Sequence, residues 1–383
     1  MIPVNSSRGR YSIYFHHSIE ENLELLCHYL RGATVVIFSN DTVFGLYGDT
    51  IQQKLQEVAM VYTHCIPDGE EHKNLQTYVQ SIISIDKFPL DRNSVILALG
   101  GGVVGDIAGF VASTLLRGIR WVQMPTTVLS MVDSSIGGKT AVNLPSAKNR
   151  LGSIYPPDLV LSNLEFVQTL PKEEIRAGFG EILKHAILAD AALFAILETH
   201  IERLLGFVEK ATNPELRDIF IDVLRRSCVI KARIVEVDEK EEGIRKILNF
   251  GHTIGHALEK VCMETGQLLR HGDAVSLGMV LELALLHEKG LVSFSVYQKV
   301  CFLVKRLDMS IYISNIGIER VCALLVLDKK VDLASTSLSM THIPEIGKAQ
   351  ILSIAVSEIQ EFLRQHLTHN FMENFVKTEY TNK

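Results

Sequence analysis

The sequence contains little of what marks several special classes of protein. It has 38 lysines and arginines against 44 aspartates and glutamates, so it lacks the positive charge excess that is typical of nucleic-acid-binding proteins. Only 21% of its 383 residues are charged and 47% are hydrophobic, with 26 glycines and 10 prolines, which excludes a disordered or collagen-like chain. The length suits about two to three domains.

Paired cysteines are missing as well. The six cysteines include no C-x-x-C pair and no zinc-ribbon spacing, a distribution that is typical of thiols in a reducing compartment. The first 15 residues contain no apolar signal-peptide core, and glycines and Asp106 interrupt the most apolar stretch, 95–116. We therefore expect a cytoplasmic protein with no membrane segment and no nucleic-acid partner.

The first half of the chain alternates between two hydrophobic patterns. Short apolar runs at 34–39, 94–99 and 119–124 end in turn residues or proline, and helix-length segments such as 47–60 and 75–87 lie between them. Buried apolar strands that alternate with helices predict a parallel α/β sheet.

The second half carries mainly helical periodicity. The segments concerned are 173–197, 216–237, 249–263, 273–289 and 296–307. We therefore expect an α/β domain over residues 1–168 and a mainly α-helical domain over residues 169–383. The cleft between two such domains is the default place for an active site.

A glycine-rich turn follows the run at 94–99. Residues 100–105 satisfy G-x-G-x-x-G, a pattern that brings backbone N–H groups close to a pyrophosphate at a helix N-terminus. A tight strand-to-helix turn without a ligand explains the same glycines equally well. A second motif, 133–140, ends like a phosphate-binding P-loop, but Asp133 replaces the first glycine, which argues against a nucleoside triphosphatase. Lys139 on this turn suits a phosphate or carboxylate, although a solvated surface lysine is the commoner outcome.

Strong hydrogen-bonding side chains form a stripe in the second half. At helical spacing, one face is shared by Arg245, Asn249, His252 and His256. Gly251 and Gly255 each lower helix propensity by up to about 1 kcal/mol, so a close approach of a ligand or another helix is the simplest reason for them. Together these residues predict a functional surface on one helix.

The histidines of the stripe have a spacing that zinc sites use. His252 and His256 are four residues apart, but the Glu of H-E-x-x-H is absent, so this is not a zincin protease. A metal would need a further ligand, and spacing leaves both Glu181 and His271 as candidates. Any single histidine here could instead be an ordinary capped or core residue.

The motifs as a set are specific. They are Gly100–Asp106, Pro125–Thr127, Val132–Ala141, Lys148–Asn149, Ala177–Lys184, Leu248–Glu259 and His271–Gly272. In this order they resemble the 3-dehydroquinate synthase family of sugar phosphate cyclases, over about Asp68 to Lys330. The resemblance implies a Rossmann-like N-terminal domain that binds NAD, a helical domain that binds Zn²⁺ or Co²⁺, and a homodimer.

The resemblance also implies roles for individual residues. The metal ligands fall on Glu181, His252 and His271, which leaves His256 to the substrate. The NAD contacts fall on Asp68, Gly69, Glu70, Glu71, His72, Lys73, Gly102, Val103, Val104, Gly105, Asp106, Thr126, Thr127, Lys139, Lys148, Phe166, Val167, Gln168 and Thr169. The catalytic and substrate contacts fall on Arg117, Asp133, Lys139, Asn149, Lys184, Lys231, Arg245, Asn249, His256 and Lys329, with Lys330 as an alternative to Lys329.

The chain departs from the family pattern at a few positions. Asn40 stands where an Asp is usual near the adenosine ribose, and Gly180 replaces a usual Ala. His185-Ala186 replaces a usual Tyr-Gly, and Asp273 replaces a usual Glu. None of these changes removes an expected metal ligand or substrate-binding charge.

The implied substrate is a small phosphorylated keto-sugar acid, 3-deoxy-arabino-heptulosonate 7-phosphate. NAD⁺ would oxidise carbon 5 and later be regenerated, phosphate would be eliminated, and an aldol step would close the ring of 3-dehydroquinate. A cyclase with another substrate, a metal-dependent polyol dehydrogenase and a non-catalytic binding module are the alternatives. The many cations that could pair with phosphate and carboxylate favour the cyclase.

Overall fold

The computed structural model describes residues 1–145, 147–307, 317–326, 331–332 and 337–367. The chain divides into two compact units. The first unit contains residues 1–175 and 207–239, and the second contains residues 176–206 and the chain from 240 onward. The segment 207–239 thus returns to the first unit, whereas the sequence suggested one boundary after residue 168.

The first unit is built on a seven-stranded sheet in the order β1-β2-β9-β6-β5-β3-β4. In chain order the strands are β1 (Ile2–Ser6), β2 (Gly9–His16), β3 (Thr34–Asn40), β4 (Met60–Ile66), β5 (Val95–Gly100), β6 (Arg120–Pro125) and β9 (Leu159–Asn163). β1 and β2 pair antiparallel, and all other pairs are parallel. The predicted parallel α/β sheet is confirmed.

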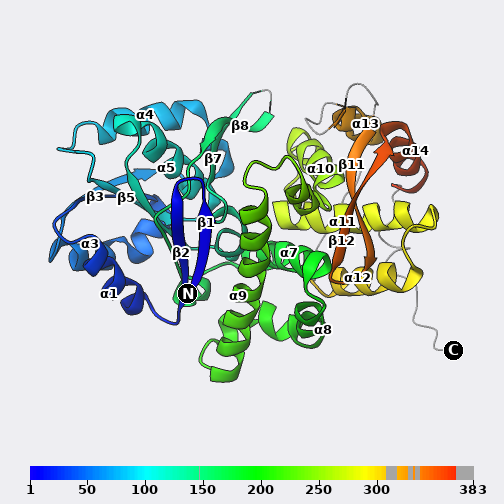
Figure 1. The fold of residues 1–383 in the computed structure, drawn as a ribbon, viewed down its shortest axis with the longest axis horizontal. Helices are drawn as coiled ribbons and strands as arrows, with labels where there is room; N and C mark the ends of the chain where they lie inside the picture. The colour runs from blue at the N-terminus through cyan, green and yellow to red at the C-terminus, as the bar shows by residue number, and fades with distance from the viewer. Residues whose placement is uncertain (146, 308–316, 327–330, 333–336, 368–383) are drawn as a thin grey trace. The chain divides into compact units, whose positions relative to one another are not determined.

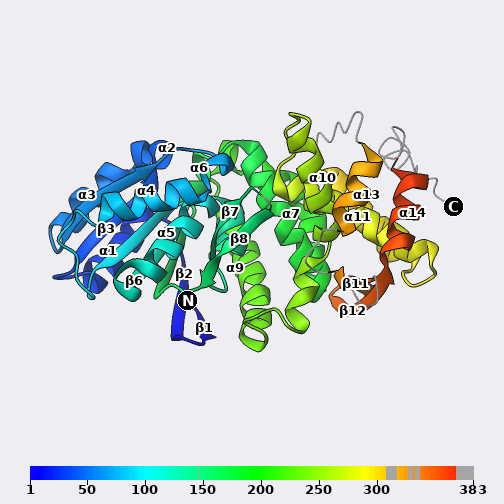
Figure 2. The same cartoon turned by 90° about the horizontal axis from the view of Figure 1, so that it is seen from above.

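Helices cover both faces of this sheet. The helices of the first unit are α1 (Ile19–Tyr29), α2 (Asp41–Val43), α3 (Asp49–Gln56), α4 (Leu75–Ile85), α5 (Gly102–Thr114), α6 (Glu165–Gln168) and α9 (Pro214–Val237). α4 and α5 lie against one face, and α1 and α3 lie against the other (Figures 1 and 2). Every residue of the inner strand β5 is buried, as expected for a parallel strand that is covered on both sides. A hairpin of β7 (Lys139–Leu144) and β8 (Ala147–Ile154) packs beside α5.

The second unit is mainly helical. Its helices are the part of α7 (Lys172–Ala189) from Arg176 onward, α8 (Ala191–Leu205), α10 (His252–Glu264), α11 (His271–Glu288), α12 (Phe294–Arg306), α13 (Ile318–Val326) and α14 (Val356–His366). The sequence predicted one helix over 173–197, but Asp190 divides it, because its side chain accepts a hydrogen bond from the Leu193 backbone N–H and begins α8. No helix among the described residues is long and apolar enough to cross a membrane.

The second unit also contains a small antiparallel sheet that the helical pattern did not indicate. Its strands are β10 (Val331–Asp332), β11 (Ser337–Glu345) and β12 (Lys348–Ala355). The sheet packs against α11, α12 and α14, as Figures 1 and 2 show. β11 is also hydrogen-bonded to the short 3-10 helix before α10, because the Thr341 hydroxyl donates to the backbone oxygen of Ile247.

Glycines allow three helices of the second unit to approach closely. A Cβ on Gly278 would collide with the backbone of Gly251, and one on Gly255 would lie 2.7 Å from the backbone oxygen of Ala274. A Cβ on Gly272 would collide with the backbone of Ala177 in the same way. Packing against another helix therefore accounts for the glycines at 251 and 255.

The predicted helix 249–263 begins later than expected. Residues Ile244–Asn249 form a separate short 3-10 helix, η6, and α10 begins only at His252. Gly251 between them has φ of 75°, a left-handed conformation that favours glycine. The prediction that Arg245 and Asn249 share one helix with His252 and His256 is therefore wrong.

Candidate functional site

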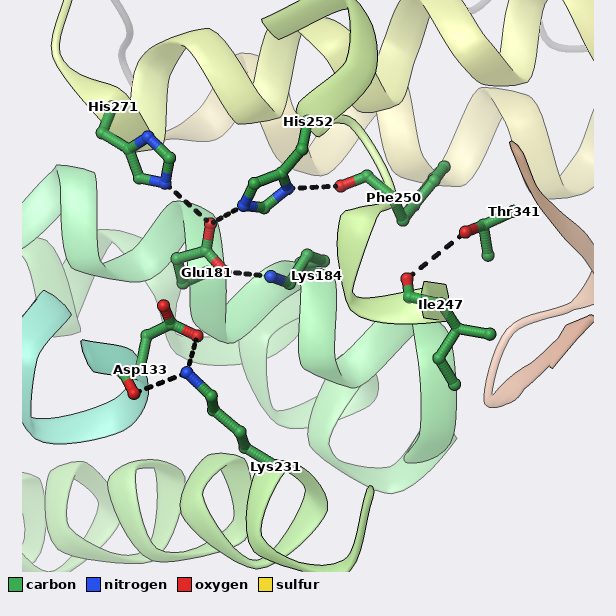
Figure 3. A network of polar contacts seen from close by, with 9 residues as sticks. All are labelled: Asp133, Glu181, Lys184, Lys231, Ile247, Phe250, His252, His271 and Thr341. Atoms are coloured by element: carbon green, nitrogen blue, oxygen red, sulfur yellow. Dashed lines mark hydrogen bonds and ion pairs between the residues drawn. The ribbon is translucent and has the colours of Figure 1, made fainter. Parts of the chain in front are cut away.

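Glu181 lies at the centre of a polar cluster in the second unit. Its side chain on α7 is fully buried, and its carboxylate forms an ion pair with Lys184 one turn later. The Nε2 atoms of His252 and His271 lie 3.5 Å and 3.6 Å from one oxygen of the same carboxylate (Figure 3). The structure thus brings together residues that are up to 90 positions apart in the sequence, 271 − 181.

The backbone orients the first of these histidines. The Nδ1 atom of His252 lies 3.1 Å from the backbone oxygen of Phe250 and donates to it, since a carbonyl can only accept. That contact leaves the lone pair on Nε2, which faces Glu181 (Figure 3). The turn at Gly251 makes the contact possible, because it places Phe250 just before the start of α10.

The cluster is strongly polarised. Burial alone would raise the pKa of Glu181, but Lys184 and the two histidines outweigh it and hold that pKa well below its usual range. Burial likewise opposes the charged form of His271, yet the neighbouring carboxylates of Glu181 and Glu259 raise its pKa to about 10. Glu181 is therefore an ionised carboxylate that is buried beside Lys184 and two imidazoles.

The donor set fits a divalent metal. Among the described residues, neither oxygen of Glu181 accepts a hydrogen bond of normal geometry, although both are buried. One carboxylate and two imidazoles with Nε2 facing inward form the kind of ligand set that catalytic zinc sites use. His256 belongs to the same neighbourhood, because nitrogens of His252, His256 and His271 all lie within 4.8 Å of one another.

Arg245 and Asn249 lie on η6, ahead of α10. Arg245 is buried, with 3% of its surface exposed. The Asn249 side chain donates to Glu241 at 2.6 Å. Glu241 has φ of 64°, an uncommon left-handed conformation for a residue other than glycine, which is typical of functional loops.

In the first unit, the predicted glycine turn joins β5 to α5. Gly101 precedes the first residue of the helix, so the N–H groups of its first turn point toward the turn. A Cβ on Gly102 would lie 3.2 Å from the Ser134 hydroxyl, so glycine keeps this space open. Among the described residues, the buried hydroxyls of Ser134 and Thr126 have no hydrogen-bond partner. Orphaned hydroxyls beside a free helix N-terminus fit the phosphates of a dinucleotide.

Lys73 and Asp106 connect two of the segments that were expected to contact NAD. Lys73 Nζ lies 2.5 Å from the Asp106 carboxylate, and both side chains are largely buried. Burial raises the pKa of Asp106, and Lys73 opposes that effect. The pair fixes the loop before α4 against the first turn of α5.

Asn143 joins two further segments. Its backbone N–H donates to the Lys73 oxygen at 2.8 Å, and its side chain donates to Glu70 at 2.8 Å. Its side-chain oxygen accepts from the Asn149 backbone N–H, also at 2.8 Å, and Asn149 has φ of 49°. Asn143 therefore holds the expected NAD segment near Glu70 and the substrate candidate Asn149 in one network.

The position of Asn40 shows how its amide is used. The Asn40 side chain donates to the carboxylate of Asp68, and Thr42 donates to the other Asp68 oxygen at 2.7 Å. A carboxylate therefore lies beside the C-terminal end of β3 even though residue 40 itself is an asparagine.

Lys231 and Asp133 form a further ion pair in the first unit, in which Lys231 is buried and Asp133 is partly buried. Lys231 Nζ on α9 lies 2.7 Å from the Asp133 side chain and 2.5 Å from its backbone oxygen (Figure 3). This contact explains why α9 belongs to the first unit, because it packs against the segment Ser130–Ser134.

The remaining expected residues are distributed as follows. In the first unit, Arg117 lies at an exposed turn with φ of 66°, and Lys139 and Lys148 lie exposed on the β7–β8 hairpin. Phe166, Val167 and Gln168 lie on α6, with Thr169 at its end. Lys329 and Lys330 lie outside the described residues.

Sequence reasoning missed three polar residues of these networks. Asn143 and Glu241 carry no pattern in the sequence that marks them. Glu259 does carry a signal, since it lies three residues after His256 at the end of the motif Leu248–Glu259.

Known proteins resemble this chain both in fold and in sequence. The chain is similar to 2-epi-5-epi-valiolone synthase from Streptomyces hygroscopicus, solved with NAD⁺ and Zn²⁺ bound, at 29% identity and a TM-score of 0.81 over 93% of this chain and 96% of the other. It has the fold of 2-deoxy-scyllo-inosose synthase, solved with carbaglucose-6-phosphate, NAD⁺ and Co²⁺, at 23% identity and a TM-score of 0.81 over 95% and 99% of the two chains. The fold class is thus that of the sugar phosphate cyclases.

The family itself follows from the sequence comparisons. The model of the 3-dehydroquinate synthase N-terminal part matches residues 63–177, and that of the C-terminal part matches residues 178–331. A 3-dehydroquinate synthase of Picosynechococcus is 41% identical over 82% of this chain and 85% of its own length. The chain belongs to the 3-dehydroquinate synthase family.

Proposed function

We propose that the chain converts 3-deoxy-arabino-heptulosonate 7-phosphate to 3-dehydroquinate and phosphate, as a carbon–oxygen lyase (EC 4.2.3.4) of the shikimate pathway. The observation that carries this proposal is the cluster of Glu181, His252 and His271, which lies within the matched C-terminal part of the family. The reaction involves no net oxidation, because the carbons of the products have the same overall oxidation level as those of the substrate.

The proposal requires two groups that the chain would bind. Glu181, His252 and His271 would hold a divalent metal, Zn²⁺ or Co²⁺, which as a Lewis acid would polarise the hydroxyls at carbons 4 and 5. The segment from Asp68 to Lys73, the turn before α5 and Thr126 would hold NAD, which supplies a reversible oxidation at carbon 5. The support in each case is geometric: a buried carboxylate with two inward nitrogens, and orphaned hydroxyls beside a helix N-terminus.

The chain's own cations have a clear task in this reaction. The substrate carries a phosphate and a carboxylate, and Lys184, Arg245 and Lys231 are buried cations that can hold such groups through charge-assisted bonds. Asn249 and His256 can orient the hydroxyls of the substrate. The departing phosphate can itself accept the proton that leaves carbon 6, so the elimination balances without a further base.

We also propose zinc or cobalt as the resident metal, a homodimer and a cytoplasmic location, as the resemblance and the composition imply. The expected active-site cleft between the two units stays a prediction. Zinc is supported by the donor set of one carboxylate and two imidazoles.

The proposal is tested by supplying the full chain with NAD, Zn²⁺ and 3-deoxy-arabino-heptulosonate 7-phosphate and measuring phosphate together with 3-dehydroquinate. We expect one phosphate for each 3-dehydroquinate, and loss of both after treatment with a chelator. Phosphate release without a cyclic product, or no reaction in the loaded protein, would refute the assignment.

A further inference from the structure

Glu259 lies beside a metal-ligand candidate but has no place in the expected site. It lies on α10, seven residues after His252, and its side chain is largely buried, with 12% exposed. Its carboxylate oxygen lies 3.7 Å from Nδ1 of His271, the first residue of α11. The two imidazole nitrogens of His271 thus face two different carboxylates, Glu181 from Nε2 and Glu259 from Nδ1.

An imidazole that binds a metal through one nitrogen must carry its proton on the other. In metalloproteins that second N–H is donated to a carboxylate or a backbone carbonyl, which fixes the tautomer, orients the ring and makes the ligating nitrogen more basic. His252 meets this requirement through the Phe250 oxygen at 3.1 Å. For His271 the group that faces Nδ1 is the Glu259 carboxylate, at an ion-pair distance of 3.7 Å that must shorten slightly to become a hydrogen bond.

We propose that Glu259 is a positioning residue that accepts the Nδ1 proton of His271 and so presents Nε2 to the metal. The inference rests on the proposed metal site formed with Glu181 and His252. Glu259 touches neither metal nor substrate in this account, and it acts only through the imidazole of His271.

The packing of α10 against α11 supports this role. A Cβ on Gly255 would lie 2.7 Å from the Ala274 backbone oxygen, and a Cβ on Gly278 would collide with Gly251, so the two helices are in direct backbone contact. Two helices held at that distance fix the separation between Glu259 and His271 better than a loop could. The side chain of His271 is 27% exposed, against 10% for His252. The ring of His271 is therefore less restrained by surrounding side chains, and a hydrogen bond has more effect on its orientation.

The test compares three variants of the full chain with the wild type: Glu259→Gln, Glu259→Ala and the control Glu264→Gln. Glu264 lies on the same helix but is exposed and pairs with Arg320. The Zn²⁺ dissociation constant of each is measured by chelator competition, and the unfolding temperature of each metal-free protein is measured alongside. The cobalt-substituted proteins are compared by their visible absorption bands.

Glu259→Ala should weaken Zn²⁺ binding about 10- to 100-fold, the usual effect of losing an outer-shell partner. Glu259→Gln should lose less, because its amide oxygen can still accept the Nδ1 proton. Both should shift the cobalt bands, while Glu264→Gln should match the wild type in affinity and spectrum. The metal-free unfolding temperatures should stay close to one another, and Glu259→Gln remains informative if Glu259→Ala does not fold.

Three results would overturn the inference. If the wild type binds one Zn²⁺ and both Glu259 variants bind it equally well, Glu259 does not position His271, although the proposed metal site survives. If Glu264→Gln loses as much affinity as the Glu259 variants, the effect belongs to the helix and not to this contact. If the wild type binds no Zn²⁺ at all, the proposed metal site fails, and the role of Glu259 fails with it.

Discussion

His252 and His256 lie one turn apart on α10, with ring centroids 5.1 Å apart and ring planes at 82°. The spacing alone would make them a natural pair of zinc ligands. Their surroundings differ, however, because His252 is buried, with Nε2 3.5 Å from Glu181, whereas His256 is exposed. The structure therefore separates two histidines that the sequence pattern treats as equivalent.

The first prediction concerns the roles of these two histidines. His252→Ala should lose the bound metal, because it removes a nitrogen that faces Glu181. His256→Ala should retain the metal and lose at least about tenfold in kcat/KM, as expected when a polar contact to the substrate is removed. Elemental analysis beside steady-state kinetics checks both. An empty metal site in His256→Ala with a filled site in His252→Ala would show that the ligand assignment is reversed.

The second prediction concerns Lys231, which is paired with Asp133 in the first unit. Lys231→Ala should lower kcat/KM about ten- to a hundredfold, since removing one partner from a charged hydrogen bond costs about 1.5–3 kcal/mol. The matched control is Arg226→Ala on the same helix, where a partly exposed residue pairs with Asp222. The control should change kcat/KM and the free energy of unfolding by no more than about 0.5 kcal/mol. If Lys231→Ala and Arg226→Ala had the same kcat/KM, Lys231 would not be part of the substrate site.

The third prediction concerns the stability of the helix packing that carries the metal ligands. Gly278→Ala should lower the free energy of unfolding by about 1–3 kcal/mol, because its Cβ would collide with the backbone of Gly251. Gly206→Ala is the control, since the nearest atom to its Cβ would lie at 3.4 Å. Denaturant unfolding of the two variants measures the difference. If Gly278→Ala is no less stable than Gly206→Ala, the backbone contact between α10 and α11 is not as close as described.

Three inner strands of the first unit, β3, β5 and β6, were predictable because each is a mostly apolar run. The run 94–99 matches β5 (Val95–Gly100) to within one residue, since a strand that is buried on both faces needs apolar side chains at every position. The glycine turn was equally visible, because its position between a strand and a helix is a local property of the sequence.

Other features depend on contacts between distant segments and so left no local signal. The helical period over 245–256 continues through Phe250 and Gly251, but the left-handed conformation of Gly251 ends one helix and begins another. The same period in α9 identifies a helix but does not say that Lys231 pairs with Asp133, 98 residues earlier. Spacing could not choose between Glu181 and His271 as a further ligand, and the structure brings both to the same cluster.

The central claim is that the chain is a cyclase that regenerates its NAD in every turnover. The most direct measurement supplies 3-deoxy-arabino-heptulosonate 7-phosphate in large excess over NAD and follows phosphate and NADH absorbance together. The account predicts that phosphate release continues for many turnovers per NAD while no NADH accumulates. Steady accumulation of NADH, with turnover that stops once the NAD has been reduced, would contradict it and indicate a dehydrogenase.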